Sequence, residues 1–261
     1  MKYIDIHCHL NLDDYDLDRD EVIQRAREKH VAMIVVGIDR KTSELAIKLA
    51  EENPDIWAVI GMHPADSASE VFDEDVYRKM AQHPRVVAIG EVGLDYNHQG
   101  YERKQVQQEI FEKMIALANE VKKPLMLHIR NGLDKEKNAY LDTLEILKKH
   151  AKVHGDVHFF AGNWEEAKQF LDLGFRLSFT GVITFTHDYD EVIKNAPLNM
   201  IMSETDAPFV APVPNRGKRN EPVNIIEVAQ AIAEIKGEPF EKVQAHLVDN
   251  ACKLFSIPNL K

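Results

Sequence analysis

Cysteine is scarce in this chain, and the sequence has neither a long apolar run nor an excess of basic residues. The two cysteines in 261 residues, Cys8 and Cys252, lie at opposite ends of the chain and suggest no disulfide framework. No apolar run approaches the roughly 20 residues that a membrane-spanning helix needs. The first ten residues place Asp5, His7 and His9 where a signal peptide would need its apolar stretch. These absences predict a cytoplasmic protein with no membrane partner.

The charge balance is acidic, with 32 basic against 43 acidic residues and a formal net charge of −11. Such a charge argues against a broad positively charged groove for duplex DNA. It does not exclude a nucleic acid as the substrate, because bound metal ions can supply positive charge locally. The net charge therefore restricts how a nucleic acid could bind without deciding the substrate.

Short apolar runs alternate with helical patterns through almost the whole chain. The runs predict strands at residues 3–7, 32–37, 57–62, 86–91, 125–129, 157–160, 175–179 and 199–204. Strands that are apolar on both faces and are each followed by a helix indicate a parallel sheet covered on both sides. Eight of them favour a closed (β/α)8 TIM barrel over an open doubly wound sheet. The lack of a G-x-G-x-x-G motif after the first strand further weakens the open-sheet alternative.

The clearest helical pattern runs from about Glu102 to Val121, with Val106, Ile110, Met114 and Leu117 on the same face as Val121. After the eighth strand, the proline-rich and charged segment 207–222 predicts a long loop. Two helices are expected after it, at about 222–236 and 239–254. Because the sequence shows no internal repeat, low-complexity tract or linker, residues 1–261 are predicted to form one domain.

Potential metal ligands are found at the ends of the predicted strands. They are His7 and His9 closing the first strand, Glu91 the fourth, His128 the fifth, His158 within the sixth, and Asp206 after the eighth. In such barrels the carboxyl ends of the strands converge on the face that carries the active site. The six side chains are therefore predicted to meet there, although they are remote in sequence.

Each of these residues also has a structural interpretation. A lone buried histidine such as His158 is as often a hydrogen-bonded core residue as a ligand. A carboxylate such as Glu91 at the end of an apolar strand is rarer, because burying it unpaired costs several kcal/mol. Neighbouring side chains of a strand point to opposite faces, so Cys8 between His7 and His9 is predicted to pack in the core. The combination of six residues on one barrel face favours a metal site.

The chain resembles the TatD family of metal-dependent hydrolases, which are amidohydrolase-like barrels. The matching motifs are IDIHCHL (4–10), GMHP (61–64), AIGEVGLDY (88–96), PLMLHIR (124–130), VHFFAG (157–162), SETDAP (203–208) and RGKRNEP (216–222). They keep the family's order over nearly the whole chain, and ETDAP together with GEVGLDY is highly specific. Two stretches beside the barrel mouth depart from the family pattern: HFFAG, where members often have Cys and Ser after the His, and residues 131–142.

The resemblance implies two divalent metal ions per chain. His7, His9, Glu91 and Asp206 would hold one ion, and Glu91, His128 and His158 would hold the other, so that Glu91 bridges the two. Nitrogen and oxygen ligands suit zinc, manganese, iron or nickel, and several histidines disfavour calcium. Magnesium fits if water molecules complete its coordination shell.

Two metal ions that share a carboxylate can activate water for in-line attack on phosphorus, because metal binding lowers the pKa of water towards neutrality. Asp206 could also take the proton of that water, so Asp206 and Glu91 are the predicted catalytic residues. The resemblance suggests that His63 contacts the scissile phosphate, although it could instead only cap the turn at Pro64. Arg130 could bind a phosphate or pair with a loop carboxylate.

Further residues are expected to support the site. Asp5 and Glu204 precede His7 and Asp206 by two residues and are interpreted as partners that orient the ligands. The basic stretch containing Arg216, Lys218 and Arg219 could clamp a nucleic-acid backbone, or could be a solvated loop paired with acidic neighbours.

The sequence thus predicts a metal-dependent hydrolase, in the first place a deoxyribonuclease that acts as a monomer on DNA ends or single strands. The alternative keeps the metals and changes the bond to an amide, lactone or ester, such as the aminoacyl ester of a tRNA. A barrel that only binds metal is disfavoured, because a structural site would not need a shared open pair of ions. A phosphate-sized anion beside both metals would favour the nuclease, and a narrow apolar pocket would favour the alternative.

Overall fold

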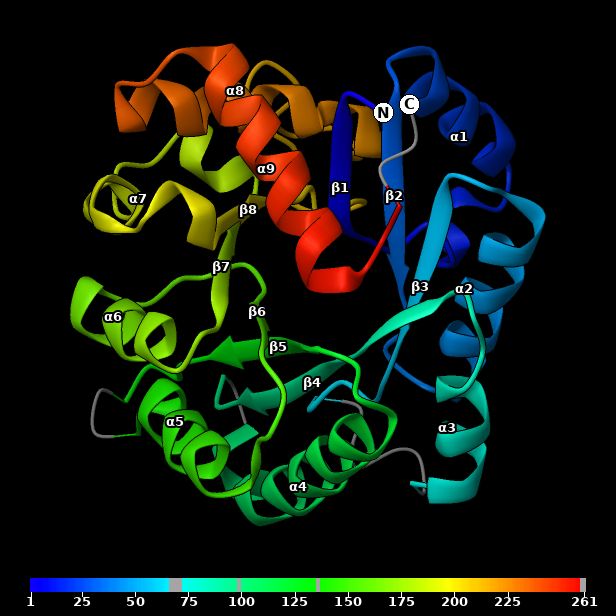
Figure 1. Cartoon of the computed structure of the whole chain (residues 1–261), viewed down its shortest axis with the longest axis vertical. Coiled ribbons are helices and arrows are strands. Elements are labelled where there is room, and N and C mark those ends of the chain that lie inside the picture. The colour runs from blue at the N-terminus through cyan, green and yellow to red at the C-terminus, as the bar shows by residue number, and fades with distance from the viewer. Residues whose placement is uncertain (66–71, 98–99, 135–136, 259–261) are drawn as a thin grey trace.

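The computed structural model shows eight strands enclosed by helices (Figure 1). It describes residues 1–65, 72–97, 100–134 and 137–258, so residues 135 and 136 of the divergent stretch 131–142 lie outside the description. The strands are β1 (Tyr3–Cys8), β2 (Val31–Val36), β3 (Ile56–Ile60), β4 (Val86–Asp95), β5 (Leu125–Arg130), β6 (Gly155–Val157), β7 (Arg176–Phe179) and β8 (Ile201–Ser203).

Each strand is followed by helical structure. The α-helices of the described residues are α1 (Arg19–Glu28), α2 (Arg40–Glu52), α3 (Glu74–Ala81), α4 (Lys104–Val121), α5 (Ala139–His150), α6 (Trp164–Asp172), α7 (Asp190–Asn195), α8 (Ile225–Lys236) and α9 (Phe240–Phe255). Short 3-10 helices are η1 (Asp13–Tyr15), η2 (Gly100–Arg103), η3 (Gly181–Thr184), η4 (Leu198–Met200) and η5 (Pro222–Asn224). Side-chain caps fix several helix starts; Asp39 and Asn163 each form a reciprocal capping box at α2 and α6.

All eight strands are parallel and follow one another around the sheet in chain order, from β1 to β8. The segment after β8 then closes the barrel against β1. The Asp206 amide donates to the carbonyl of His7 at 2.9 Å, and the His9 amide donates to the carbonyl of Ala207 at 2.7 Å. The predicted barrel is therefore confirmed, and the open sheet is excluded. The same backbone seam brings the side chains of His7, His9 and Asp206 to one place.

Alternate strand residues fill two apolar layers. In β2, Met33 and Val35 belong to the cluster that includes the buried faces of the surrounding helices. Ile34 and Val36 belong to a second cluster, which they share with Phe255 of α9. This second cluster is the barrel interior, and α9, which lies between β1 and β8 in Figure 1, closes its amino-terminal end.

Seven of the predicted strands are confirmed, but the end of the fourth is wrong at a functional position, and the predicted sixth strand, 157–160, shares only Val157 with β6. β4 runs to Asp95, so Glu91 lies inside the strand rather than at its end, and the pairing with β5 shifts register between Ile89 and Val92. Such an irregularity re-aims side chains. β6 ends at Val157, so the next residue, His158, follows the strand. The extended conformation stops there because the residue after His158 has a φ of +44°.

The predicted helix at 102–121 begins at Lys104 after a 3-10 turn. Ile110, Met114 and Leu117 are buried as predicted, whereas Val106 is 44% exposed. Its place on the buried face was wrong, because the neighbouring Gln107 is the buried residue there, where its side chain hydrogen-bonds the backbone of Asp95.

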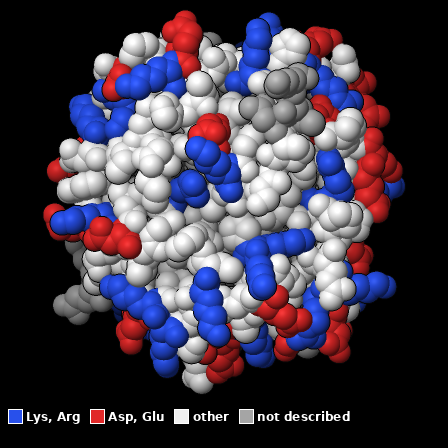
Figure 2. All heavy atoms as spheres, in the orientation of Figure 1, with Lys and Arg blue, Asp and Glu red and all other residues white. Residues whose placement is uncertain are grey.

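No helix in the described ranges combines the length and the apolar character needed to cross a membrane. On the face shown in Figure 2, basic and acidic side chains are interspersed around the rim of the molecule, and uncharged residues occupy much of the middle. This face therefore presents no broad area of positive charge alone, as the acidic net charge led us to expect.

The role of α9 can be tested with Phe255, which is 2% exposed within the interior cluster. Phe255→Ala should lower the free energy of unfolding by about 3–5 kcal/mol, because it leaves a cavity in a packed core. Urea denaturation with an unchanged m-value measures the loss. The control Val106→Ala, on an exposed position of α4, should stay within about 0.5 kcal/mol of the parent. Equal effects of the two substitutions would contradict the closing role of α9.

Candidate metal centre

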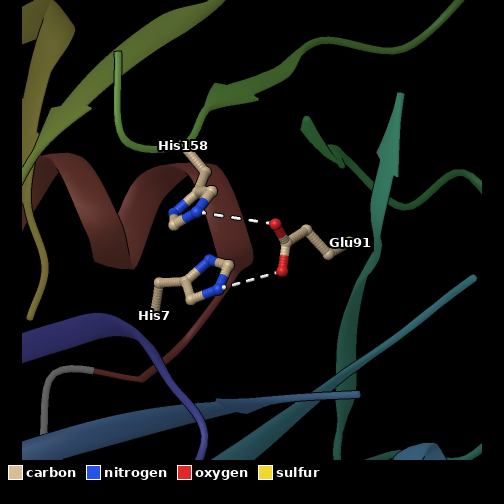
Figure 3. Close-up of side chains that lie close together, drawn as sticks. All are labelled: His7, Glu91 and His158. Carbon is tan, nitrogen blue, oxygen red and sulfur yellow. Dashed lines mark ion pairs between the residues drawn. The ribbon is translucent and has the colours of Figure 1, made fainter. Parts of the chain in front are cut away.

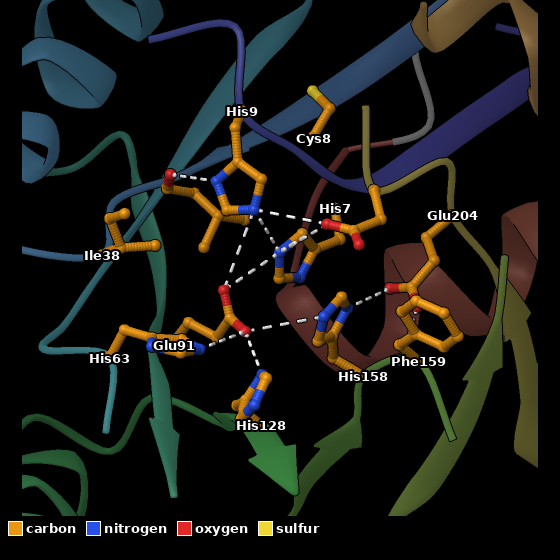
Figure 4. A network of polar contacts seen from close by, with 12 residues as sticks. His7, Cys8, His9, Ile38, His63, Glu91, His128, His158, Phe159 and Glu204 are labelled. Carbon is orange, nitrogen blue, oxygen red and sulfur yellow. Dashed lines mark hydrogen bonds and ion pairs between the residues drawn. The ribbon is translucent and has the colours of Figure 1, made fainter. Parts of the chain in front are cut away.

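The six predicted metal ligands converge at one end of the barrel, where His7, His9, His128 and His158 surround the carboxylate of Glu91 (Figure 4) and Asp206 lies beside His7 and His9. The Oε2 atom of Glu91 lies 3.4 Å from His7 Nε2 and 3.8 Å from His9 Nε2. Its Oε1 atom lies 2.6 Å from His128 Nδ1 and 3.6 Å from His158 Nε2. Figure 3 shows this division, with one oxygen directed to His7 and the other to His158. Glu91 thus presents one oxygen to each of two groups of histidines.

Asp206 completes the first group. His7 Nε2 and His9 Nε2 are 3.1 Å apart, and Asp206 Oδ1 lies 3.4 Å from His9 Nε2 and 3.9 Å from His7 Nε2. Bonds of about 2.0–2.2 Å to a common ion would place neighbouring ligand atoms roughly 3.0–3.5 Å apart. Nitrogen and oxygen atoms that converge at nearly this spacing in a buried site fit a divalent cation.

The second nitrogen of three histidines is held by an oxygen acceptor. The pairs are His9 Nδ1 with the carbonyl of Val36 at 3.1 Å, His128 Nε2 with Asp95 Oδ2 at 3.1 Å, and His158 Nδ1 with Glu204 Oε2 at 3.0 Å. Because these oxygens can only accept, each outer nitrogen must carry the proton. In the neutral ring the inner nitrogen then has a lone pair aimed at the site, which is the form that binds a metal.

His7 is held differently from the other ligands. Its Nδ1 has no hydrogen-bond partner among the described residues, and its ring stacks on that of His158 with centroids 3.5 Å apart. Stacking and the barrel seam therefore fix its orientation.

His63 has the opposite proton arrangement. Its Nδ1 accepts a hydrogen bond from the Ala65 amide at 3.1 Å, so Nε2 carries the proton and lies 3.6 Å from Glu91 Oε1. Burial and the neighbouring charge of His128 lower the pKa of His63 to about 3, which keeps the ring neutral. The turn-capping contact is thus present, and it leaves a donor in the mouth that suits an oxyanion better than a metal ion.

Asp95 is a residue of the site that the sequence reasoning missed. It is the last residue of β4, four positions after Glu91, so both carboxylates lie on one face of the strand. His63, Asp95 and His128 form a third group with potential ligand atoms within 4.8 Å of one another. The neutral ring of His128 has one nitrogen lone pair. It can therefore bind an ion in this third group or an ion beside Glu91, but not both. The signal in the sequence was the i, i+4 carboxylate pair within an apolar strand.

The two predicted orienting residues act in different ways. Glu204 holds the ring of His158, as its hydrogen bond shows. Asp5 is fully buried and accepts the amides of His7 at 3.2 Å and Thr205 at 2.9 Å, so it orders backbone rather than a ring. Cys8 is buried in the outer apolar cluster and points away from Glu91 (Figure 4), as predicted for a core residue.

Charges in the site are strongly coupled. Burial lowers the pKa of both His128 and His158, but hydrogen bonds and charges from nearby carboxylates outweigh it, raising the first to about 9 and the second to about 10. Burial alone would raise the pKa of Glu91, yet the surrounding histidines hold it well below its usual value. Without metal, protons on the histidines therefore balance the buried carboxylates.

The site opens into a cavity of about 1190 Å³. Its wall includes the predicted substrate residues His63 and Arg130, together with Arg103. Arg130 is the last residue of β5, and no carboxylate of the described residues lies within ion-pair distance of its side chain. The alternative prediction, a salt bridge between Arg130 and a carboxylate in a loop, is therefore not found among the described residues.

The basic stretch of the last loop does not line this cavity. Arg219 pairs with Asp18 at 2.6 Å and lies over the Tyr15 ring, and Arg216 lies over the Phe185 ring at 4.0 Å. The backbone clamp suggested for Arg216, Lys218 and Arg219 is thus wrong for Arg219, because its guanidinium is already engaged by an acidic neighbour.

The sequence and the fold match known proteins. The model of the TatD-related DNase family matches residues 4–256. The chain belongs to the TatD-related DNase family. It is a metal-dependent hydrolase, and the predicted family and fold are confirmed.

Its relatives match over nearly their whole length. YabD of Bacillus subtilis, an uncharacterized metal-dependent hydrolase, is 42% identical over 260 residues, which are 97% of this chain and 98% of the relative. YcfH of Escherichia coli K12, also an uncharacterized metal-dependent hydrolase, is 34% identical over 265 residues, 98% of this chain and 97% of the relative. The crystal structure of the TatD homologue YjjV from E. coli K12 has a TM-score of 0.90 at 26% identity, covering 98% and 99% of the two chains. These names specify no substrate.

The raised pKa values of His128 and His158 lead to a prediction for metal binding. At pH 7.5 both rings are protonated in the metal-free protein, so binding of zinc or manganese should release about two protons per chain. Metal affinity should rise with pH through the neutral range and level off above the pKa of these histidines. Calorimetric titration in buffers of different ionisation enthalpy measures the proton count.

Two variants control this experiment. His158→Gln should release about one proton fewer, because one of the two titrating rings is gone. His83→Gln removes a surface histidine that pairs with Glu51 and should leave the count unchanged. Metal binding without proton release would show that the two site histidines are neutral before the metal arrives.

Proposed function

We propose that this TatD-family hydrolase cleaves phosphodiester bonds of DNA, at ends or within single strands. The observation that carries the proposal is the wide cavity above the buried ligands, with Arg103 and Arg130 in its wall. Its volume of about 1190 Å³ exceeds that of an ordinary small-molecule pocket, and guanidinium groups suit phosphates. The amide, lactone or ester alternative would be favoured by a narrow apolar pocket, and the width of this cavity favours the nuclease instead.

We assign two divalent ions to the site, one on each side of Glu91. His7, His9 and Asp206 would hold one ion with Glu91 Oε2, and His128 and His158 would hold the other with Glu91 Oε1. The spacing of the donor atoms of His7, His9 and Asp206 supports the first ion, and the proton positions on the outer ring nitrogens leave the inner nitrogens of His9, His128 and His158 free to bind. When bound, such ions polarise a phosphate and lower the pKa of water.

In the proposed reaction, side chains of this protein would accept a proton and bind phosphate oxygens. Burial would raise the pKa of Asp206, but in the metal-free site the hydrogen bond from protonated His9 and the charge of His158 hold it below its usual value, so the carboxylate is ionised. It can therefore accept the proton of the attacking water. His63 offers its Nε2–H to a non-bridging phosphate oxygen, and the Arg130 guanidinium can hold a flanking phosphate.

The proposal is tested by assaying the metal-replete protein in parallel on single-stranded DNA, a simple aryl phosphodiester and an aminoacyl ester. Cleavage of DNA with the highest kcat/KM is expected, and Arg130→Ala should weaken it more than it weakens cleavage of the aryl diester. Turnover of the aminoacyl ester alone would overturn the proposal in favour of the alternative.

The bridging assignment predicts unequal metal loss from two variants. Glu91→Ala should lower the occupancy of both ions, because each of its oxygens faces one group of histidines. His128→Ala should chiefly empty one site, because its ring contacts only the Oε1 side. Mass spectrometry of the intact protein counts the ions. Equal loss from both variants would remove the basis for a bridge.

The role of Asp206 predicts a loss in turnover rather than in binding. Asp206→Asn keeps the size of the side chain but removes its basicity, so kcat should fall by roughly two to four orders of magnitude. KM should change far less, because the lost interaction belongs to the transition state. Steady-state cleavage of short single-stranded DNA measures both constants, with metal content determined alongside.

The exposed Asp188, in the loop before α7, provides a matched control, since Asp188→Asn should leave kcat unchanged. An Asp206→Asn variant with full metal content and near-parental turnover would show that another group accepts the proton.

A further inference from the structure

Cationic and aromatic side chains lie in different parts of the cavity wall. Both arginines in the wall come from the structure around β4 and β5: Arg103 follows β4, and Arg130 ends β5. Its phenylalanines and tyrosine come from the other side, where Phe159 follows β6, Tyr189 follows β7 and Phe209 follows β8. Because the strands follow one another around the barrel, the cationic and the aromatic residues occupy separate sectors of one mouth.

The two phenylalanines lie directly beside the candidate metal ligands. The Phe159 ring is 6.0 Å from the ring of His158, and the Phe209 ring is 6.1 Å from that of His9, both edge-on. Phe209 is 52% exposed, so part of its ring is open to the cavity. An aromatic surface therefore adjoins each side of the site.

The backbone that carries these rings is held in an unfavourable conformation. Phe159 has a φ of +44°, and Val210, next to Phe209, has a φ of +43°. Such angles cost free energy for residues other than glycine and persist where surrounding contacts impose them. The Phe159 amide donates to Glu204 Oε1 at 2.6 Å, and the other oxygen of Glu204 holds His158. The position of the Phe159 backbone is thus coupled to that of a ligand.

We propose that the aromatic sector stacks on an unpaired nucleobase while the arginine sector holds the adjoining phosphodiester backbone. This inference rests on the proposed nuclease function and adds to it a subsite for the base next to the scissile bond, formed by Phe159 and Phe209. Every base has a face that stacks on an aromatic ring, so binding would tolerate any sequence. A base inside a duplex has both faces covered by its neighbours and cannot reach these rings.

The test compares two single-stranded oligonucleotides. One carries every base, and the other has an abasic analogue in place of the nucleotide beside the cleaved bond. The comparison is made for cleavage at each end of the oligonucleotide in turn. The parent protein should prefer the base-bearing substrate by about 5- to 100-fold in kcat/KM, the range of one stacking contact. Phe159→Ala and Phe209→Ala should lower this preference towards one and leave cleavage of the abasic substrate unchanged. Phe209→Trp should retain the preference, whereas Phe209→Leu, which is apolar without a ring, should not.

Two control variants separate stacking from general damage. Phe185→Ala removes a half-buried phenylalanine outside the cavity that contacts Arg216, and should keep the preference. Arg130→Ala should slow both substrates equally and leave the preference intact, because both retain the phosphate.

A binding measurement gives a second readout. An oligonucleotide with 2-aminopurine at the same position and a phosphorothioate at the scissile linkage should lose fluorescence on binding to the parent protein, because stacking quenches the base. Phe209→Ala should reduce this quenching. Cleavage of base-bearing and abasic DNA at equal rates would overturn the stacking and leave the nuclease function standing. Failure to cleave either substrate would overturn the nuclease function, and the stacking with it.

Discussion

The Glu91 carboxylate is 3% exposed, and histidines from β1, β5 and the segment after β6 surround it. A buried carboxylate without compensation would cost several kcal/mol, and so would each buried imidazolium. Two successive sets of contacts compensate the buried charge of Glu91. Histidines face the oxygens of Glu91, and Asp95, Glu204 and the carbonyl of Val36 hold the outer nitrogens of three of them. The result is a buried site in which each charged group faces groups that compensate it.

In this chain the same backbone hydrogen bonds close the barrel and bring the residues of the site together. The backbone hydrogen bonds that join β1 to the segment after β8 connect residues about 200 positions apart, and they set His7 and His9 beside Asp206. Asp5 strengthens the seam from within by accepting amides from both sides of it. A change that loosens the seam would therefore disturb the site as much as the fold.

The histidines of the mouth have different chemical roles although they are the same residue type. An outer oxygen acceptor makes the inner nitrogen a lone-pair donor for a cation, as in His9, His128 and His158. An outer amide donor makes the inner nitrogen a proton donor, as in His63. The backbone and carboxylates behind each ring thus decide whether it binds a metal ion or an oxyanion.

The sequence by itself determined the number of strands, their parallel order, and the five residues that meet around Glu91. Strand periodicity and the position of polar residues at strand ends are local properties, and the barrel topology converts them into a common location. Only the tertiary structure decided the proton positions on the histidines, the role of Asp95, the engagement of Arg219 by Asp18, and the separation of aromatic from cationic residues around the mouth. Each of these depends on contacts between segments remote in sequence, or on the direction of a side chain at an irregular backbone position, and neither is encoded in local periodicity.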